Sequence, residues 1–218
     1  MPRTHDLVFM LAVAVTSAAF KTEATAAEVT KLTPGSAWQV LSRYSGKVNY
    51  YTLAEEHGVK MWHAKYHPDM DTVILYAKLP KAGLYSSLRW RWRVQKFPIN
   101  ADETVDGRTD SAGAVYVYFD TTFRQYIIKY VWSVKHEQGF AFRSADSSII
   151  RKMQVVVREG PPPWTDSWVT ETVNPVEDFK KYFGGDDVPP LVGIGLLTDG
   201  DGTQSEVEAD YADFELHD

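Results

Sequence analysis

Three arginines alternate with apolar residues in the segment LRWRWRV at residues 88–94. Successive side chains of a strand point to opposite faces, so Arg89, Arg91 and Arg93 share one face at intervals of about 7 Å. Guanidinium groups bind carboxylates and sulfates through paired hydrogen bonds, which predicts a binding surface for an anionic polymer. The alternative is a solvated face neutralised by Asp and Glu, where each exposed ion pair contributes only ~0–1 kcal/mol.

Three aspartates offer hard oxygen ligands. Asp110 precedes a predicted strand, while Asp199 and Asp201 follow another, so all three can meet at one end of a sheet. This arrangement predicts a candidate structural calcium site. The loop differs from an EF-hand, because Gln204 occupies the position of the invariant glycine. Aspartates that hydrogen-bond backbone amides in a metal-free turn are the alternative. The same turn and the acidic loop at residues 102–110 are the expected carboxylate partners of the arginines.

Aromatic side chains supply the candidate sugar-stacking surfaces. Trp164 and Trp168 both follow the loop GPPP at residues 160–163 and lie outside any clean strand pattern. Tyr116 and Tyr118 alternate within a predicted strand. Aromatic rings stack on apolar faces and keep a polar edge, which suits a carbohydrate ligand. Rings that plug the end of a sandwich, or pack within it, are the alternative for all four.

Catalysis of polysaccharide cleavage has no specific motif in this chain. Hydrolysis needs two carboxylates about 5 to 10 Å apart, and a lyase needs a Tyr or His base beside a cation. Tyr116 and Tyr118 beside Arg91 would form a lyase site. Serine-hydrolase, zinc-protease, nucleotide-binding and dinucleotide-binding motifs are absent from the sequence. The carboxylates available for hydrolysis include Glu171, Asp166 and Glu215. No catalytic residue is assigned, and the sequence favours a non-enzyme.

Short strands must position these residues. Residues 114–119 and 126–134 are rich in β-branched and aromatic residues around a short break, which predicts a hairpin inside a sheet. Gly193 and Gly195 in the apolar strand at 191–197 predict close packing against rings. Further strands are predicted at residues 38–41, 48–54, 59–66, 72–79, 88–94, 153–158, 168–173 and 211–216. Residues 31–35 are predicted to be a turn, and Pro80 and Gly83 to end a strand.

One helix interrupts this pattern. Asn174 is the expected N-cap, Pro175 the first helical residue and Gly184 the terminator. Many strands and one short helix, with no alternation of the two, predict an all-β fold. We expect an antiparallel two-sheet sandwich, jelly-roll-like.

The N-terminal segment predicts export. Arg3, an apolar run at residues 7–20 and the small residues at 24–26 are typical of a signal peptide, leaving one domain at residues 27–218. The chain has no Cys, which fits a periplasmic or secreted protein stabilised by packing alone. A net charge of -6 argues against nucleic acid as a partner. We expect a monomer, without stable membrane insertion once the signal is removed.

Four segments resemble a bacterial family of unknown function, DUF3047. They are LRWRWRV, the aspartate-bearing loop that leads into AVYVYF, the YVW at residues 130–132, and GIGLLTDGDGT ahead of YADFEL. The resemblance implies an exported single-domain protein similar to carbohydrate-binding β-sandwiches. It implies no activity and no catalytic residues. We therefore expect an exported protein that binds a carbohydrate or other polar polymer, with anionic polymers among the expected ligands. A polysaccharide-cleaving hydrolase or lyase and an envelope protein-interaction module are the alternatives.

Overall fold

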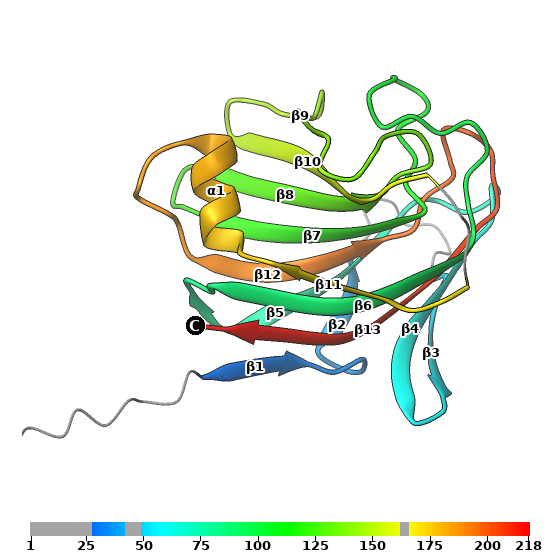
Figure 1. Ribbon diagram of the computed structural model, residues 1–218, viewed down its shortest axis with the longest axis horizontal. Coiled ribbons are helices and arrows are strands. Elements are labelled where there is room, and N and C mark those ends of the chain that lie inside the picture. The colour runs from blue at the N-terminus through cyan, green and yellow to red at the C-terminus, as the bar shows by residue number, and fades with distance from the viewer. Residues whose placement is uncertain (1–27, 42–48, 162–165) are drawn as a thin grey trace, which may run out of the picture.

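The computed structural model describes residues 28–41, 49–161 and 166–218, which form two β-sheets packed face to face (Figure 1). The first sheet is ordered β11-β6-β13-β4-β3. Strand β1 also pairs with β13, along the half that β4 leaves free. Its strands are β1 (Val29–Leu32), β3 (Tyr51–Glu56), β4 (Val59–Tyr66), β6 (Ser87–Lys96), β11 (Val169–Val173) and β13 (Val207–His217).

The second sheet is ordered β2-β5-β12-β7-β8-β10-β9. Its strands are β2 (Trp38–Leu41), β5 (Ile74–Gly83), β7 (Gly113–Asp120), β8 (Gln125–Trp132), β9 (Ala141–Arg143), β10 (Arg151–Glu159) and β12 (Leu191–Leu197). The predicted all-β, jelly-roll-like sandwich is confirmed, as is the hairpin of β7 and β8. One pair departs from antiparallel pairing, because β10 lies parallel to β8 after a crossover that contains β9.

The tryptophan face of β6 forms the centre of the core. Trp90 and Trp92 are fully buried. Their rings lie 5.7 Å from Tyr130 and 5.6 Å from Trp132, respectively, on β8 of the opposite sheet. The strict alternation of the LRWRWRV segment therefore directs its large rings between the sheets, as predicted.

The second sheet is covered on both faces. Along β7, Val115, Val117 and Phe119 join the core between the sheets. Tyr116 and Tyr118 point the other way, into a second apolar cluster with Met153 of β10. This double burial explains why β7 has no polar face in the sequence.

The helix α1 (Pro175–Phe183) has the predicted boundaries. Asn174 Oδ1 accepts a hydrogen bond from the Glu177 amide at 3.1 Å, and the helix ends at Gly184, whose φ is 79°. Phe179 packs 5.1 Å from Phe119. The helix therefore closes the core at the end of β7 (Figure 1).

Several predicted boundaries were wrong. The last strand was expected at residues 211–216, but β13 begins four residues earlier, at Val207, where it pairs with Tyr66 of β4. Residues 31–35 were expected to be a turn, but β1 reaches Leu32 because it completes the edge beside β13. Strand β5 continues through Pro80 to Gly83. Proline is tolerated there because β2 pairs only with Ile74–Ala77 and leaves that side of Pro80 unpaired.

The predicted signal segment at residues 1–26 lies outside the described residues. Within the described part of the chain, no helix is long and apolar enough to cross a membrane.

Candidate functional site

A groove of about 640 Å³ lies on the face of the second sheet that points away from the first. Strands β2, β5, β7, β8, β10 and β12 contribute to it. Its centre is apolar and aromatic, with Tyr76, Tyr116 and Tyr118 among its lining residues. Its polar lining residues are Thr72, Asp120, Gln125, Asp146, Arg151 and Asp201.

Two glycines of β12 make room for these rings. A Cβ atom on Gly193 would collide with the Tyr76 ring. A Cβ atom on Gly195 would lie 3.0 Å from the Tyr118 ring. The predicted packing of rings against both glycines is therefore confirmed, and the missing side chains allow the tyrosines to lie across β12.

The three tyrosines form a nearly continuous floor. The rings of Tyr116 and Tyr118 are 6.0 Å apart and within 15° of parallel, and Tyr76 meets Tyr118 edge-on at 5.4 Å. Tyr116 and Tyr118 are each only 7% exposed, whereas Tyr76 is half-buried. Burial raises the pKa of all three phenols above the ordinary value. Their hydroxyls therefore stay neutral and can both donate and accept hydrogen bonds.

Lys129 lies on β8 beside this floor, with its ammonium 5.7 Å from the Tyr116 ring. It is buried and has no hydrogen-bond or ion-pair partner among the described residues. Burial lowers the pKa of Lys129, and the nearby Asp199 and Glu103 partly oppose that change. Sequence reasoning missed this residue, although a single cation in the apolar run YIIKYVW was a visible signal.

Carboxylates outnumber cations around the groove. Asp120, Asp146 and Asp201 line it with Arg151. The Arg151 guanidinium is close enough to Tyr116 and Tyr118 to oppose the rise in their pKa values. Sequence reasoning also missed Arg151 and Asp146, because residues 138–151 show no periodic pattern.

The three predicted metal ligands meet at one end of the groove. Carboxylate oxygens of Asp110, Asp199 and Asp201 lie within 4.8 Å of one another. Asp110 accepts hydrogen bonds from the Gly202 and Thr203 amides at 3.1 and 2.7 Å, so it anchors the loop after β12. The three oxygens match the ligand type of calcium, but the site itself stays a prediction. Melting temperatures measured with calcium and with a chelator would test it.

Asp199 is the most perturbed member of this group. Burial, followed by the charges of Asp201 and Asp110, raises its pKa from 3.8 to about 6. Its Oδ1 accepts a hydrogen bond from Thr72 Oγ1 at 2.9 Å. A carboxyl group that holds its proton up to about pH 6 therefore lies beside two other carboxyl groups.

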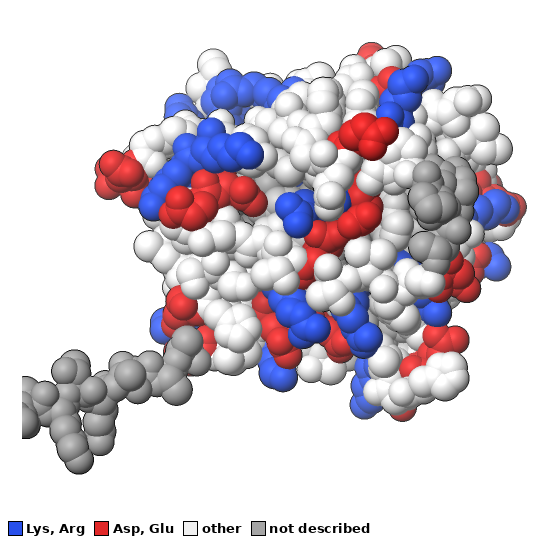
Figure 2. Space-filling view, in the orientation of Figure 1, with Lys and Arg blue, Asp and Glu red and all other residues white. Residues whose placement is uncertain are grey.

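The arginine face of β6 lies on the opposite side of the molecule, on the outer face of the first sheet. Arg89 pairs with Glu215 at 3.4 Å, and Arg91 pairs with Asp213. Arg93 binds the buried Asp210 at 2.7 Å. Figure 2 shows basic and acidic side chains interleaved over β6 and β13, with no continuous basic patch.

The predicted partners of the arginines were wrong. They were expected from the acidic loop or the Asp199/Asp201 turn, but β13 supplies one carboxylate to each arginine because it is the neighbour of β6 in the sheet. The three arginines therefore already have anionic partners within the protein.

The other predicted site residues fall in three places. Trp168 stacks over two arginines, with its ring centroid 5.3 Å from the guanidinium carbon of Arg91 and 4.9 Å from that of Arg93. It therefore covers part of the arginine face. Trp164 lies outside the described residues. Tyr116 and Tyr118 line the groove of the other sheet. The expected lyase grouping of these tyrosines with Arg91 is therefore wrong.

The carboxylates considered for hydrolysis are engaged elsewhere. Glu215 pairs with Arg89, and Asp166 lies 3.8 Å from Arg93. Glu171 is buried and pairs with Arg158 at 2.9 Å. None of these three lines the groove.

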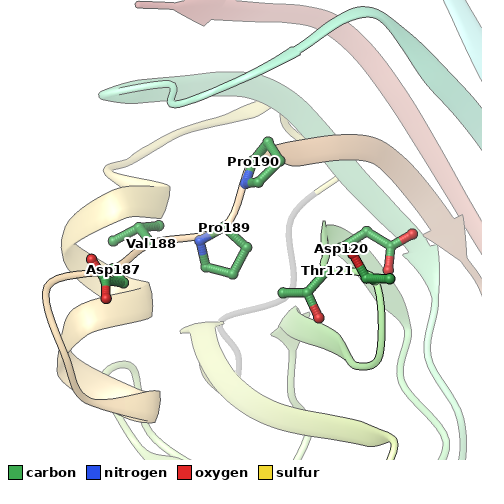
Figure 3. Close-up of a pocket in the computed structure, with 7 residues that line it drawn as sticks. Asp120, Thr121, Asp187, Val188, Pro189 and Pro190 are labelled. Carbon is green, nitrogen blue, oxygen red and sulfur yellow. The ribbon is translucent and has the colours of Figure 1, made fainter.

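A second hollow of about 580 Å³ adjoins the end of the groove (Figure 3). The turn after β7 and the segment between α1 and β12 form it, with Thr121 on one side and Pro189 and Pro190 on the other. Asp120 lines both hollows. The groove therefore continues past Asp120, around the end of β7 and the start of β12.

Comparison with known proteins gives one family match. A family described as "Protein of unknown function (DUF3047)" matches residues 36–215. Among curated proteins, no relative matches the chain.

Solved structures similar to this chain have β-sheet folds and very different sequences. A family 11 carbohydrate-binding module from Clostridium thermocellum has 9% identity and a TM-score of 0.45 over 88% of this chain and 96% of its own. An endoglucanase from Rhodothermus marinus has 10% identity and a TM-score of 0.49, with the same two coverages, 88% and 96%. A family 11 xylanase from Neocallimastix patriciarum has 11% identity and a TM-score of 0.43 over 88% of this chain and all of its own.

Proposed function

The chain belongs to the DUF3047 family of proteins of unknown function, and we propose that it binds a neutral, hydroxyl-rich polysaccharide in the groove of the second sheet. The observation that carries this proposal is the floor of Tyr76, Tyr116 and Tyr118, which two glycines make possible and polar side chains surround. The expected export would place such a ligand in the cell envelope or outside the cell.

The groove combines the two kinds of contact that a sugar chain needs. A sugar ring has apolar C–H faces that pack on aromatic rings, and hydroxyls that need directed polar partners. Tyr76 offers the most accessible ring. Gln125, Asp146 and Arg151 are polar residues that line the same groove. Arg151 can bind two adjacent hydroxyls through its planar guanidinium group.

The charges favour a neutral ligand over an acidic one. Asp120, Asp146 and Asp201 face the groove against a single guanidinium, that of Arg151. Lys129 lies beside the floor, near further carboxylates that offset its charge. A polymer of uronic acids would bring like charges together, and this repulsion opposes binding.

Binding to immobilised polysaccharides tests the proposal. Purified protein is applied to a panel of neutral glycans and to uronic-acid polymers, and the retained ligands are then titrated by calorimetry. Tyr76→Ala is expected to weaken binding about ten-fold, because it removes an aromatic contact of about 1 to 2 kcal/mol. Tyr182→Ala on α1 is the matched control, remote from the groove, and should leave affinity unchanged.

Three results would contradict the proposal: no glycan is retained, uronic-acid polymers bind better than neutral ones, or both variants weaken binding equally.

Cleavage of the same ligand is the second candidate function. One observation favours it: Asp199, with a pKa of about 6, lies beside Asp201, which faces the groove. A protonated carboxyl near an ionised one is the pairing that glycoside hydrolysis requires. Release of reducing ends from the bound glycan, abolished by Asp201→Asn, would support cleavage. Binding without release of reducing ends would leave binding as the function.

A further inference from the structure

Three large apolar side chains project from two adjacent turns at the Asp120 end of the groove. Phe123 lies in the turn between β7 and β8, while Ile149 and Ile150 directly precede β10. They are 86%, 81% and 70% exposed, the highest values among the large apolar residues in the described part of the chain. We call these three residues the apolar tip.

Hydrogen bonds to two backbone carbonyls hold the two turns together. The Gln125 amide donates to the Ile150 carbonyl at 2.9 Å, and Arg124 Nε donates to the Ile149 carbonyl at 3.1 Å. Thr121 closes the first turn, because its hydroxyl accepts from the Arg124 amide at 2.9 Å. The apolar tip is therefore a built feature in which both turns present their side chains together.

Basic residues surround the apolar tip. Arg124 directly follows Phe123, and Arg151 and Lys152 directly follow Ile150. Two carboxylates also lie at this end, Asp120 and Asp146, and both line the groove. A local excess of cations next to the tip stands out in a chain whose net charge is -6.

From this combination we propose that the apolar tip docks the protein on the surface of an anionic lipid bilayer. Exposed Phe and Ile side chains enter the boundary between headgroups and acyl chains, and the Lys and Arg side chains beside them bind lipid phosphates. Contact at loop tips needs no membrane-spanning segment. The three tip residues lie outside the groove, whereas Arg151 lines it. The tests below therefore leave Arg151 unchanged, so that docking and glycan binding are measured separately.

The absence of Cys from the chain allows a position-specific test. Ile149→Cys is labelled with an environment-sensitive fluorophore and mixed with vesicles of phosphatidylcholine and phosphatidylglycerol in equal parts. Ile99→Cys is the matched control, because Ile99 is also exposed but lies after β6, where its amide bonds to Ser205 in the loop that follows the opposite end of β12. Emission should rise and shift to shorter wavelength at position 149 alone. Vesicles of phosphatidylcholine alone, which carry no net charge, should cause no such change. Because the probe reports its own surroundings, binding through any other segment would not mimic this result.

Sedimentation with the same vesicles measures affinity. Replacing the three tip residues together with Ser should lower vesicle partitioning at least a hundred-fold, at about ten-fold per buried side chain. The matched control replaces Leu53, Ile99 and Val105 with Ser and should have no effect, since they are exposed elsewhere at 59%, 69% and 39%. Lys152→Gln should weaken partitioning about five-fold.

An unchanged spectrum at position 149, or an equal change at position 99, would overturn the proposal. So would equal losses in the two triple variants. If the apolar tip binds a protein partner instead of a bilayer, the spectrum at position 149 will stay unchanged when vesicles are added.

Discussion

Asp199→Asn should make the protein more stable at neutral and alkaline pH. In the native protein, burial and the neighbouring Asp201 and Asp110 disfavour the ionised form of Asp199. Asparagine cannot ionise, and its side-chain oxygen can still accept the hydrogen bond from Thr72. The substitution therefore removes an unfavourable charge and keeps the local geometry.

The size of the effect follows from the change in pKa. A rise from 3.8 to about 6 corresponds to about 3 kcal/mol, at about 1.4 kcal/mol for each pKa unit. The folded state holds this proton more tightly than the unfolded state does. The contribution of Asp199 is therefore most favourable below about pH 4, falls as pH rises through about 6, and is lost above that value.

Urea denaturation followed by tryptophan fluorescence gives the free energy of unfolding at each pH. At pH 8 the Asn variant should exceed the natural protein by up to about 3 kcal/mol, and near pH 4 the two should converge. Asp69→Asn, at an exposed turn, is the control and should shift neither value. A gain that is equal at both pH values, or no gain at pH 8, would refute the electrostatic reasoning.

Three further predictions concern packing, ion pairs and capping. Gly193→Ala should destabilise the protein by about 1 to 3 kcal/mol and reduce glycan binding, because its methyl group displaces a groove ring; unfolding and calorimetry measure the two effects. Arg93→Ala should cost about 1 to 3 kcal/mol, since the buried carboxylate of Asp210 loses a charged partner but keeps its hydrogen bonds to His63 and Gln95. Arg89→Ala, at an exposed pair, should cost less than about 1 kcal/mol. Asn174→Ala should lower stability by about 1 kcal/mol through loss of the helix cap, measured by thermal unfolding.

Local patterns in the sequence determined most of the strands and the helix. The alternation in LRWRWRV assigned Trp90 and Trp92 to the core, because side-chain direction in a strand depends only on position along it. The cap residues Asn174 and Gly184 set the helix boundaries for a similar reason, since they satisfy the backbone groups at its own ends. The family resemblance also rested on contiguous segments and is confirmed.

The tertiary structure decided which side chains meet. Sequence reasoning placed Tyr116 beside Arg91, but strand order put them on opposite outer faces of the sandwich. It expected the partners of the arginines in the acidic loop or the Asp199/Asp201 turn, but the register of β6 with β13 supplied them instead. It missed Lys129 and Arg151, which belong to separate strands and become candidate site residues only because the fold places them beside the tyrosines. The physical reason is common to these cases: alternation along one strand is fixed by local backbone geometry, whereas a groove across six strands depends on how distant segments pair.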